Sequence, residues 1–272
     1  MWENAKRPEV MGIVNVTPDS FSDGGRHDTT AAAIAHGRRL IAEGADLLDI
    51  GGESTRPGAA AVDETREIAR VLPVIEGLRG AGVPLSIDTM KPAVASAAIA
   101  AGAAIWNDVA ALTAPGAPQT AAELGCAVVL MHMKGEPRTM QDDPRYDDVV
   151  GEVEAFLLAR AEAAMAAGVA RDRIWLDPGI GFGKTLAHNL ALLAALPRLV
   201  ALGYPVLLGA SRKRFIATLD PLGKDADARL GGALAAALAG AAAGVAAVRV
   251  HDVRETVQAF IVQAAVASAS DR

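Results

Sequence analysis

The chain has 272 residues, of which 51% are hydrophobic and 21% are charged, so it can build a sizeable core and lacks the composition of a disordered protein. Its formal net charge of −6 argues against a nucleic-acid partner, and an anionic ligand would need locally placed Arg, Lys or a metal ion. The single cysteine, Cys126, can form no disulfide within the chain. That favours a reducing compartment, and we expect a cytoplasmic protein.

Short apolar runs alternate with helix-length stretches along the whole chain. Helices are expected at Thr29–Glu43, at Asp63–Arg79, from Pro92 onward and at Val149–Ala167. Parallel strands joined by crossover helices follow from this alternation. The strands are expected at Val10–Val16, Asp46–Ile50, Pro84–Asp88, Ala104–Asn107, Ala127–His132, Ile174–Asp177, Pro205–Gly209 and Ala246–Val250.

Eight such units are the number needed for a closed (β/α)₈ TIM barrel, an α/β fold that we expect to form a single domain over residues 1–272. Residues 231–248 carry no charge and reach the lower length limit of a membrane span. They are mostly Ala and Gly, so we expect a buried helix running into the last strand and no membrane partner. Such a smooth helix could also pack closely against another helix, as in a homodimer.

Each expected strand ends in, or leads into, a polar residue of a kind that does chemistry. The longest loops follow the first, second and fifth strands, whereas the connections from helix back to strand are short. A barrel keeps its active site at the carboxyl ends of its strands, so these side chains should meet in one pocket. They are Asn15, Asp49, Asp88, Asn107, His132, Asp177, Ser211 and His251.

Two carboxylates and an amide stand out among these residues. Asp88, Asn107 and Asp177 together suit a heterocycle that presents several N–H donors and a carbonyl. Taken singly, either aspartate could instead cap a helix or pair with a structural arginine.

Basic residues follow the seventh and eighth strands, where barrels recurrently bind phosphate. Residues 211–214 read Ser-Arg-Lys-Arg, and Arg249 and His251 share one face of an extended strand. A solvated basic face is the alternative interpretation, and we favour the phosphate site.

Metal and nucleotide motifs are weak in this sequence. DPGIGFGKT resembles a phosphate-binding loop, but Pro178 occupies the position where that motif needs glycine. The spacing typical of zinc sites is absent from the sequence, and His132 alone suggests a packed histidine. A Mg²⁺ held by one or two oxygen groups and by substrate phosphates remains open, with Asn15, Asp23 and Asp49 as candidates.

Eight strings occur in order from Val10 to about Val257, and their joint occurrence resembles the dihydropteroate synthase family of folate biosynthesis. They are MGIVNVTPDSFSDGG, DIGGESTRPGA, SIDT, WNDV, MHMKG, LDPGIGFGK, GASRK and RVHDV. Arg214 departs from the family pattern, in which a small residue is common after SRK. The resemblance implies a (β/α)₈ barrel, usually a homodimer. It also implies that 4-aminobenzoate condenses with 6-hydroxymethyl-7,8-dihydropterin diphosphate to give 7,8-dihydropteroate and diphosphate.

The resemblance also implies a role for individual residues. Asp88, Lys213, Asp23 and Arg56 would be catalytic, and Asn15 with Asp23 would support Mg²⁺. The pterin would contact Asp88, Asn107, Met131, Asp177, Lys213 and Arg249. The diphosphate would contact Asn15, Arg56, Arg249 and His251. The aminobenzoate would contact Phe21, Thr55, Arg56, Pro57, Phe182, Ser211 and Lys213.

Diphosphate departure before attack by the weakly nucleophilic amine fits these residues. Asp88 and Asp177 would favour the pterin methylene cation, and no general base is obvious. Two loops, TPDSFSDGG and ESTRPGA, would exclude water, and we expect both to be mobile without ligands.

Three other functions are compatible with this fold and these residues. A non-catalytic pterin-binding homologue would be expected to lose parts of the two loops, which are complete here. A pterin-binding methyltransferase domain would not need the STRPG loop. A Schiff-base aldolase would use Lys213 as its reactive amine.

Overall fold

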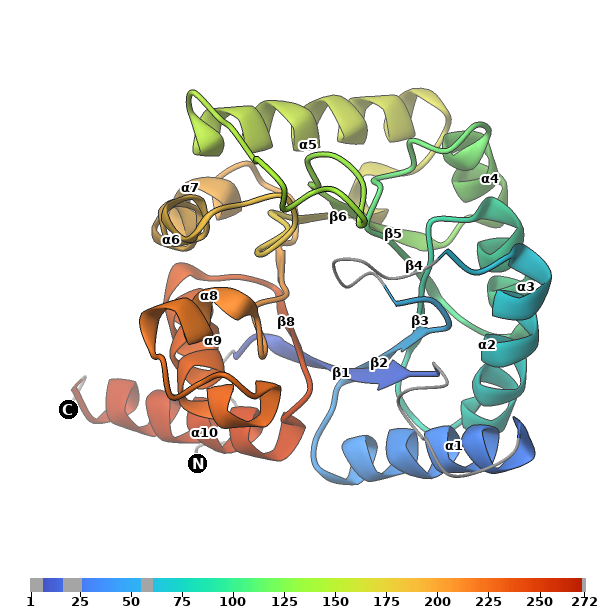
Figure 1. Ribbon diagram of the computed structural model, residues 1–272. Helices are drawn as coiled ribbons and strands as arrows, with labels where there is room; N and C mark the ends of the chain where they lie inside the picture. The colour runs from blue at the N-terminus through green and yellow to red at the C-terminus, as the bar shows by residue number, and fades with distance from the viewer. Residues whose placement is uncertain (1–6, 17–25, 55–60, 271–272) are drawn as a thin grey trace.

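A computed structural model of the chain describes residues 7–16, 26–54 and 61–270. Eight parallel strands form one sheet in the order β6-β5-β4-β3-β2-β1-β8-β7, and an isolated parallel bridge between Leu176 and Val206 joins β6 to the start of β7. The sheet is therefore a closed barrel, seen along its axis in Figure 1. The strands are β1 (Glu9–Asn15), β2 (Leu47–Gly51), β3 (Leu85–Asp88), β4 (Ile105–Asp108), β5 (Ala127–Met131), β6 (Ile174–Asp177), β7 (Leu207–Leu208) and β8 (Ala247–Val250).

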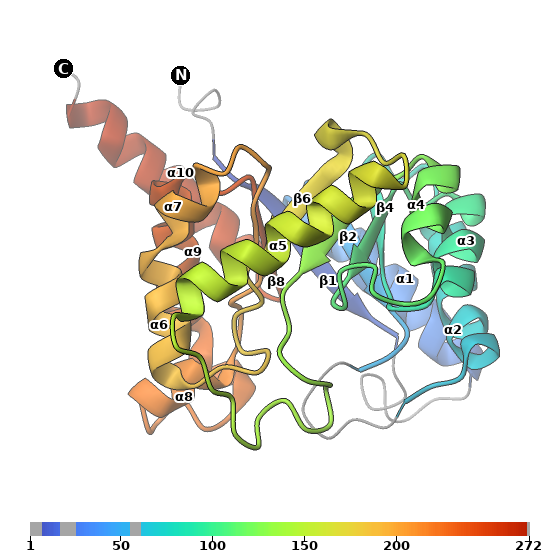
Figure 2. The same cartoon turned by 90° about the horizontal axis from the view of Figure 1, so that it is seen from above.

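Helices surround the barrel on its outside (Figure 1). Figure 2 shows the loop between β5 and α5 at one end of the barrel, and the start of β1 with the end of α10 at the other. Two short 3₁₀ turns occur at Arg171–Arg173 and Ala226–Arg229. The helices are α1 (Arg26–Ala42), α2 (Glu64–Leu78), α3 (Pro92–Ala101), α4 (Ala117–Leu124), α5 (Val149–Ala166), α6 (Leu186–Ala194), α7 (Leu196–Val200), α8 (Arg214–Leu219), α9 (Leu230–Ala243) and α10 (Val253–Ser270).

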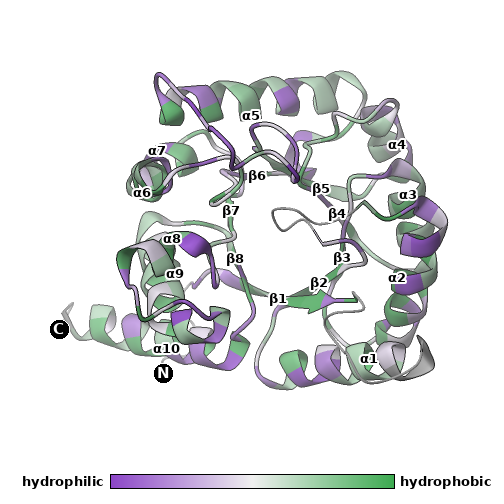
Figure 3. Cartoon of the chain, viewed as in Figure 1, coloured by the Kyte–Doolittle hydropathy of each residue, from purple (hydrophilic) through white to green (hydrophobic). Residues whose placement is uncertain are grey.

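The alternation of side chains along each strand divides the core into two parts. One face of the strands packs with the helices into a large apolar cluster that includes Trp106, Leu48 and Phe260. The other face fills the barrel interior with a small cluster of Met11, Leu47, Val129, Leu207 and Ala247. Figure 3 shows the strands coloured largely as hydrophobic. The barrel interior is therefore apolar in this layer, and the polar residues that face inward lie at the carboxyl ends of the strands.

The expected barrel is confirmed, with local differences. The seventh strand was expected to run from Pro205 to Gly209, but β7 is only Leu207–Leu208, because Pro205 has no N–H for a ladder and contacts β6 through its carbonyl oxygen, 2.9 Å from the Leu176 nitrogen. The stretch from Gly231 to Val248 is a helix followed by a strand, as expected. Within the described ranges, the structure contains no helix long and apolar enough to cross a membrane.

Candidate active site

The strand register brings the expected polar residues together at one end of the barrel. Asp88 pairs in register with Asn107, and Met131 pairs with Asp177. Asp88, Asn107 and Asp177 are all buried. These residues face inward because they occupy the same strand face as the interior cluster. The prediction that Asp88, Asn107 and Asp177 share one pocket is therefore supported by their placement.

An arginine and two aspartates form a buried network at the strand ends. The Arg249 Nε lies 2.6 Å from Asp49 Oδ2, and its Nη2 lies 2.8 Å from Asp88 Oδ2. The Asn107 Nδ2 donates to the same Asp49 oxygen over 3.1 Å. Asp49 Oδ1 and Asp88 Oδ1 are buried and accept no hydrogen bond from the part of the chain that the structure describes. Asp88 therefore keeps one acceptor oxygen for a ligand while the other holds Arg249.

Asp177 is fixed by the glycine-rich loop that follows it. Its Oδ1 accepts a hydrogen bond of 2.7 Å from the Gly179 nitrogen. Gly179 has a φ of +66°, and a Cβ added there would lie 1.9 Å from the His132 carbonyl oxygen. Only glycine fits this turn, so the loop can approach β5 closely and turn back over the barrel mouth.

Lys213 and Phe182 come together beside this pocket. The Lys213 Nζ lies 3.9 Å from the centre of the Phe182 ring, a cation–π arrangement. A Cβ added at Gly181 would lie 3.2 Å from Lys213 Cδ, so the glycine leaves room for the lysine stem. The structure thus joins two residues that the resemblance assigns to the aminobenzoate side.

Burial perturbs the acid–base properties of the site. Burial raises the pKa of Asp88 to about 7, although Arg249 opposes the rise. Burial also raises the pKa of Asp177, against the lowering effect of the hydrogen bond from Gly179. Burial, with a further contribution from the Arg249 charge, lowers the pKa of Lys213 to about 8. A charged ligand or a multivalent hydrogen-bonding ligand would relieve this cost, so the site is typical of a binding centre.

The basic cluster after the seventh strand divides in the structure. Arg212 has a φ of +57° and pairs with Asp252, with 2.6 Å between Nη2 and Oδ1. Arg214 is exposed on α8, and Lys213 alone of the three cations contacts Phe182. The expectation of one basic phosphate cluster is therefore too broad, because the ion pair with Asp252 draws Arg212 toward α10.

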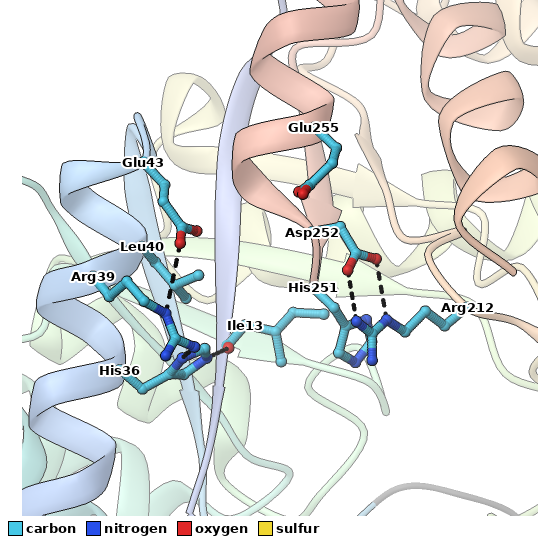
Figure 4. A pocket seen from close by; sticks show the side chains of 9 residues that line it. All are labelled: Ile13, His36, Arg39, Leu40, Glu43, Arg212, His251, Asp252 and Glu255. Carbon is cyan, nitrogen blue, oxygen red and sulfur yellow. Dashed lines mark hydrogen bonds and ion pairs between the residues drawn. The ribbon is translucent and has the colours of Figure 1, made fainter. Parts of the chain in front are cut away.

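Ser211 and His251 are joined at the same end of the barrel. The Ser211 hydroxyl lies 3.1 Å from His251 Nδ1 and accepts from the His251 backbone nitrogen at 3.2 Å. Beside them a pocket of about 440 Å³ lies between α1 and the start of α10 (Figure 4). His251 therefore borders both this pocket and the strand ends. Its lining includes His36, Arg39, Glu43, Arg212, His251, Asp252 and Glu255.

Lys184 is a further buried residue at this end of the barrel, and no motif in the sequence indicates its role. Its side chain is buried, and its Nζ lies 2.9 Å from His132 Nδ1 and 2.9 Å from the Phe182 carbonyl oxygen. Burial lowers the pKa of Lys184 to about 7. The lysine thus ties the loop that carries Phe182 to β5. In the sequence, Lys184 is the last residue of GFGK and resembles the lysine of a phosphate-binding loop.

Five expected site residues lie outside the described ranges. They are Phe21, Asp23, Thr55, Arg56 and Pro57. The expected mobility of the two loops also concerns residues outside the described ranges. Asn15 lies at the carboxyl end of β1, in register with Gly51. The His132 ring packs edge-on against Phe156 of α5, with 4.9 Å between ring centres, as suits the packed histidine that we expected.

Comparisons with known proteins bear on this site. A model of the family described as pterin binding enzyme matches residues 11–251, from β1 to the end of β8. The dihydropteroate synthase of Escherichia coli is 47% identical over 265 residues, which cover 97% of this chain and 93% of that protein. The chain belongs to the dihydropteroate synthase family.

Solved members of the family have the same fold. A Xanthomonas albilineans dihydropteroate synthase with 4-aminobenzoic acid is 56% identical and superposes with a TM-score of 0.90, covering 96% of this chain and 94% of that one. The enzyme from the same organism in complex with 7,8-dihydropteroate is 52% identical, with a TM-score of 0.86, covering 97% and 95% of the two chains. The resemblance found in the sequence is confirmed. These relatives favour a synthase over a methyltransferase, a non-catalytic homologue or an aldolase.

Proposed function

We propose that this chain condenses 4-aminobenzoate with 6-hydroxymethyl-7,8-dihydropterin diphosphate, giving 7,8-dihydropteroate and diphosphate. The observation that supports this proposal is that Asp88, Asn107 and Asp177 are buried together at the carboxyl ends of the strands, in a barrel that matches the pterin binding enzyme family. The test is to incubate the protein with both substrates and to follow dihydropteroate and diphosphate in equal amounts. Binding of the pterin substrate without release of either product would contradict the proposal.

The polar edge of the pterin matches the free hydrogen-bonding groups of the site. Asp88 Oδ1 is an unpartnered acceptor, and Asn107 has its Nδ2 engaged with Asp49, which leaves its oxygen for a ligand N–H. Asp177 supplies a further carboxylate, and Lys213 supplies a donor for the ring carbonyl. Charged hydrogen bonds of this kind are worth about 1.5–3 kcal/mol each, so together they can select one heterocycle. Met131, in register with Asp177, would contact the ring as an apolar wall.

The reaction itself needs charge stabilisation on both fragments. The bond between the pterin methylene carbon and the diphosphate oxygen breaks, and the electron pair leaves with the diphosphate. Arg249, His251, Asn15 and Arg56 would bind the departing anion. Asp88 and Asp177 would favour the delocalised methylene cation left behind. The amine nitrogen of 4-aminobenzoate then bonds to the methylene carbon and releases a proton.

The aminobenzoate would bind against the loop side of the pocket. The Phe182 ring offers a flat apolar surface, and the Lys213 ammonium lies over that ring. A benzoate carboxylate is an anion, so a neighbouring ammonium favours its binding. Phe21, Thr55, Arg56 and Pro57 would complete this side from the two loops.

We infer that Mg²⁺ assists the reaction. Among the described residues, three or more His, Cys, Asp or Glu side chains nowhere gather in a metal-binding arrangement. A Mg²⁺ that keeps its waters and is held by one or two protein oxygens plus diphosphate fits such a sparse donor set. Asn15 and Asp23 would hold it, and the ion would neutralise charge on the leaving group.

We also propose a homodimer formed through α9 and α10. A groove of about 670 Å³ between these helices is lined by Leu230, Leu234, Leu238, Val262 and Val266 among others. Val262 and Val266 are 57% and 64% exposed on the outer surface. An apolar patch of this kind on a surface is typical of an interface. A second copy of the chain is its proposed occupant, because the leucines of α9 and the valines of α10 that line the groove are partly exposed and the same apolar patch on a second copy would cover them.

A cytoplasmic location is proposed as well. Cys126 is a free and buried thiol, and burial raises its pKa. Free thiols of this kind are common in proteins of a reducing compartment. Measuring which cell fraction contains the protein tests this.

A further inference from the structure

Asp49 is the most deeply buried of the described acids that face into the barrel mouth. It faces inward on β2 and pairs in register with Ser86, whereas Asp88 pairs with Gly51, two residues nearer the strand end. Asp49 is 0% exposed and therefore lies one layer below the groups proposed to touch the pterin. Its Oδ2 nevertheless contacts two of those groups, Asn107 and Arg249.

The contact with Asp49 sets the direction of the Asn107 amide. An ionised carboxylate can only accept hydrogen bonds, so the amide must turn its NH₂ group toward Asp49. A flipped amide would bring two acceptor oxygens together in a buried site. The amide oxygen of Asn107 therefore points away from Asp49 and can accept an N–H of the heterocycle.

The same oxygen of Asp49 fixes the arginine. Arg249 is held through Nε by Asp49 and through Nη2 by Asp88, so two different atoms of its planar group are bound. Two contacts to a rigid fork define its plane as well as its position. A guanidinium held in this way can stack on a flat ring or meet a phosphate without first losing rotamer freedom.

Asp49 is poorly suited to be a magnesium ligand, although the sequence made it a candidate. A guanidinium nitrogen already lies 2.6 Å from Oδ2, and a divalent cation would be repelled by it. Asn15, the other described candidate, is level with Gly51 and not with Asp49. The charge of Asp49 is thus matched by Arg249.

We propose that Asp49 is a positioning residue that orients both Asn107 and Arg249 for the pterin substrate. This role rests on the proposed function of the site. Wild-type turnover tests that function separately, so failure of the two can be told apart.

The test is Asp49→Asn, which keeps the volume but loses the charge, so Asn107 and Arg249 can no longer both be held as before. The KM for the pterin diphosphate should rise about 10-fold or more, and the KM for 4-aminobenzoate should change less than about twofold, because Phe182 and Lys213 do not contact Asp49. Ser86→Ala is the matched control, since Ser86 is equally buried in the same layer and its hydroxyl has no partner among the described residues. It should leave both KM values unchanged.

A double-mutant cycle separates positioning from simple stability. Adding Asp49→Asn to Asn107→Ala should cost clearly less pterin affinity than Asp49→Asn costs alone, because one of its two targets is gone. Full additivity, or an equal rise in both KM values with a lower Tm, would overturn the proposal. So would a loss seen only in the Mg²⁺ dependence, which would make Asp49 a metal ligand. If Asp49→Asn fails to fold, the hydrogen-exchange rate of the Asn107 side-chain NH₂ group is measured in the wild-type protein instead. Slow exchange is expected, and rapid exchange with solvent would contradict the hydrogen bond to Asp49.

Discussion

At the scale of single residues, the site contains charged side chains whose burial costs desolvation free energy. Asp177 accepts from the Gly179 nitrogen and is 4% exposed, so its carboxylate has few partners until a ligand arrives. Asp177→Ala should lower affinity for the pterin substrate by at least about 10-fold, because one charged hydrogen bond is worth about 1.5–3 kcal/mol. Calorimetric titration with the pterin measures this, with Asp177→Asn as a control that keeps an acceptor. Unchanged binding in Asp177→Ala would show that the site assignment is wrong.

The pKa values of two residues predict how the activity depends on pH. Asp88 has its pKa raised to about 7 by burial, so it becomes protonated below that pH and loses an acceptor charge. Lys213 has its pKa lowered to about 8 by burial, so it becomes neutral above that pH and loses its cation. The profile of kcat/KM for the pterin diphosphate should therefore fall on both sides of about pH 7–8.

Variants connect each limb of that profile to its residue. Asp88→Asn should lower the maximum and flatten the acid limb, since the amide does not titrate. Lys213→Arg should move the alkaline limb to higher pH, because arginine stays charged throughout this range. An acid limb that persists unchanged in Asp88→Asn would assign it to another group, such as the substrate phosphates.

At the scale of elements, the sequence predicted the strands and their polar ends but not the contacts between them. Inward alternation along apolar runs was enough to bring Asp88, Asn107 and Asp177 together. The bonds that Asp49 makes join it to residues 58 and 200 positions away. Such pairings depend on register and barrel closure, which no local pattern specifies. For the same reason, the sequence pattern does not distinguish Arg212 from Lys213, although it is Arg212 that forms an ion pair with Asp252.

The loop after β6 shows how a glycine can position a site. In Gly179→Ala, the added Cβ would meet the His132 carbonyl at 1.9 Å, and the φ of +66° would be strained. The left-handed backbone costs about 1–2 kcal/mol and overpacking about 1–3 kcal/mol, so unfolding in urea should show a loss of at least about 2 kcal/mol. Activity should also fall, because Phe182 lies on the same loop.

Gly231 provides the matched control for this substitution. It lies in α9, where an added Cβ would meet nothing within 4 Å. Gly231→Ala should leave activity unchanged and stabilise the protein by about 0.5–1 kcal/mol, as alanine does in helices. Equal stability of the two variants would mean that the close approach between Gly179 and β5 is absent in solution.

At the scale of the whole molecule, the barrel buries its chemistry at one end and leaves an apolar face on its outer ring. The groove between α9 and α10 and the exposed Val262 and Val266 form that face, and we propose that a second copy covers it. A stable interface buries about 800 Å² on each partner and tolerates an unpaired charge at its centre poorly. Val262→Lys should therefore convert a dimer into a monomer, because the ammonium would be desolvated without a partner.

Sedimentation velocity at micromolar concentration measures the mass directly, and Leu222→Lys serves as the control. Leu222 is 88% exposed and does not line the groove, so this variant adds the same charge elsewhere on the surface. Leu222→Lys should remain dimeric and should keep the wild-type unfolding midpoint, since Leu222 does not belong to the buried core. A monomeric wild-type protein, or a dimeric Val262→Lys variant, would contradict the α9–α10 interface. A Val262→Lys monomer that retains full turnover would show that each barrel carries a complete site, as expected from strand ends that all belong to one chain.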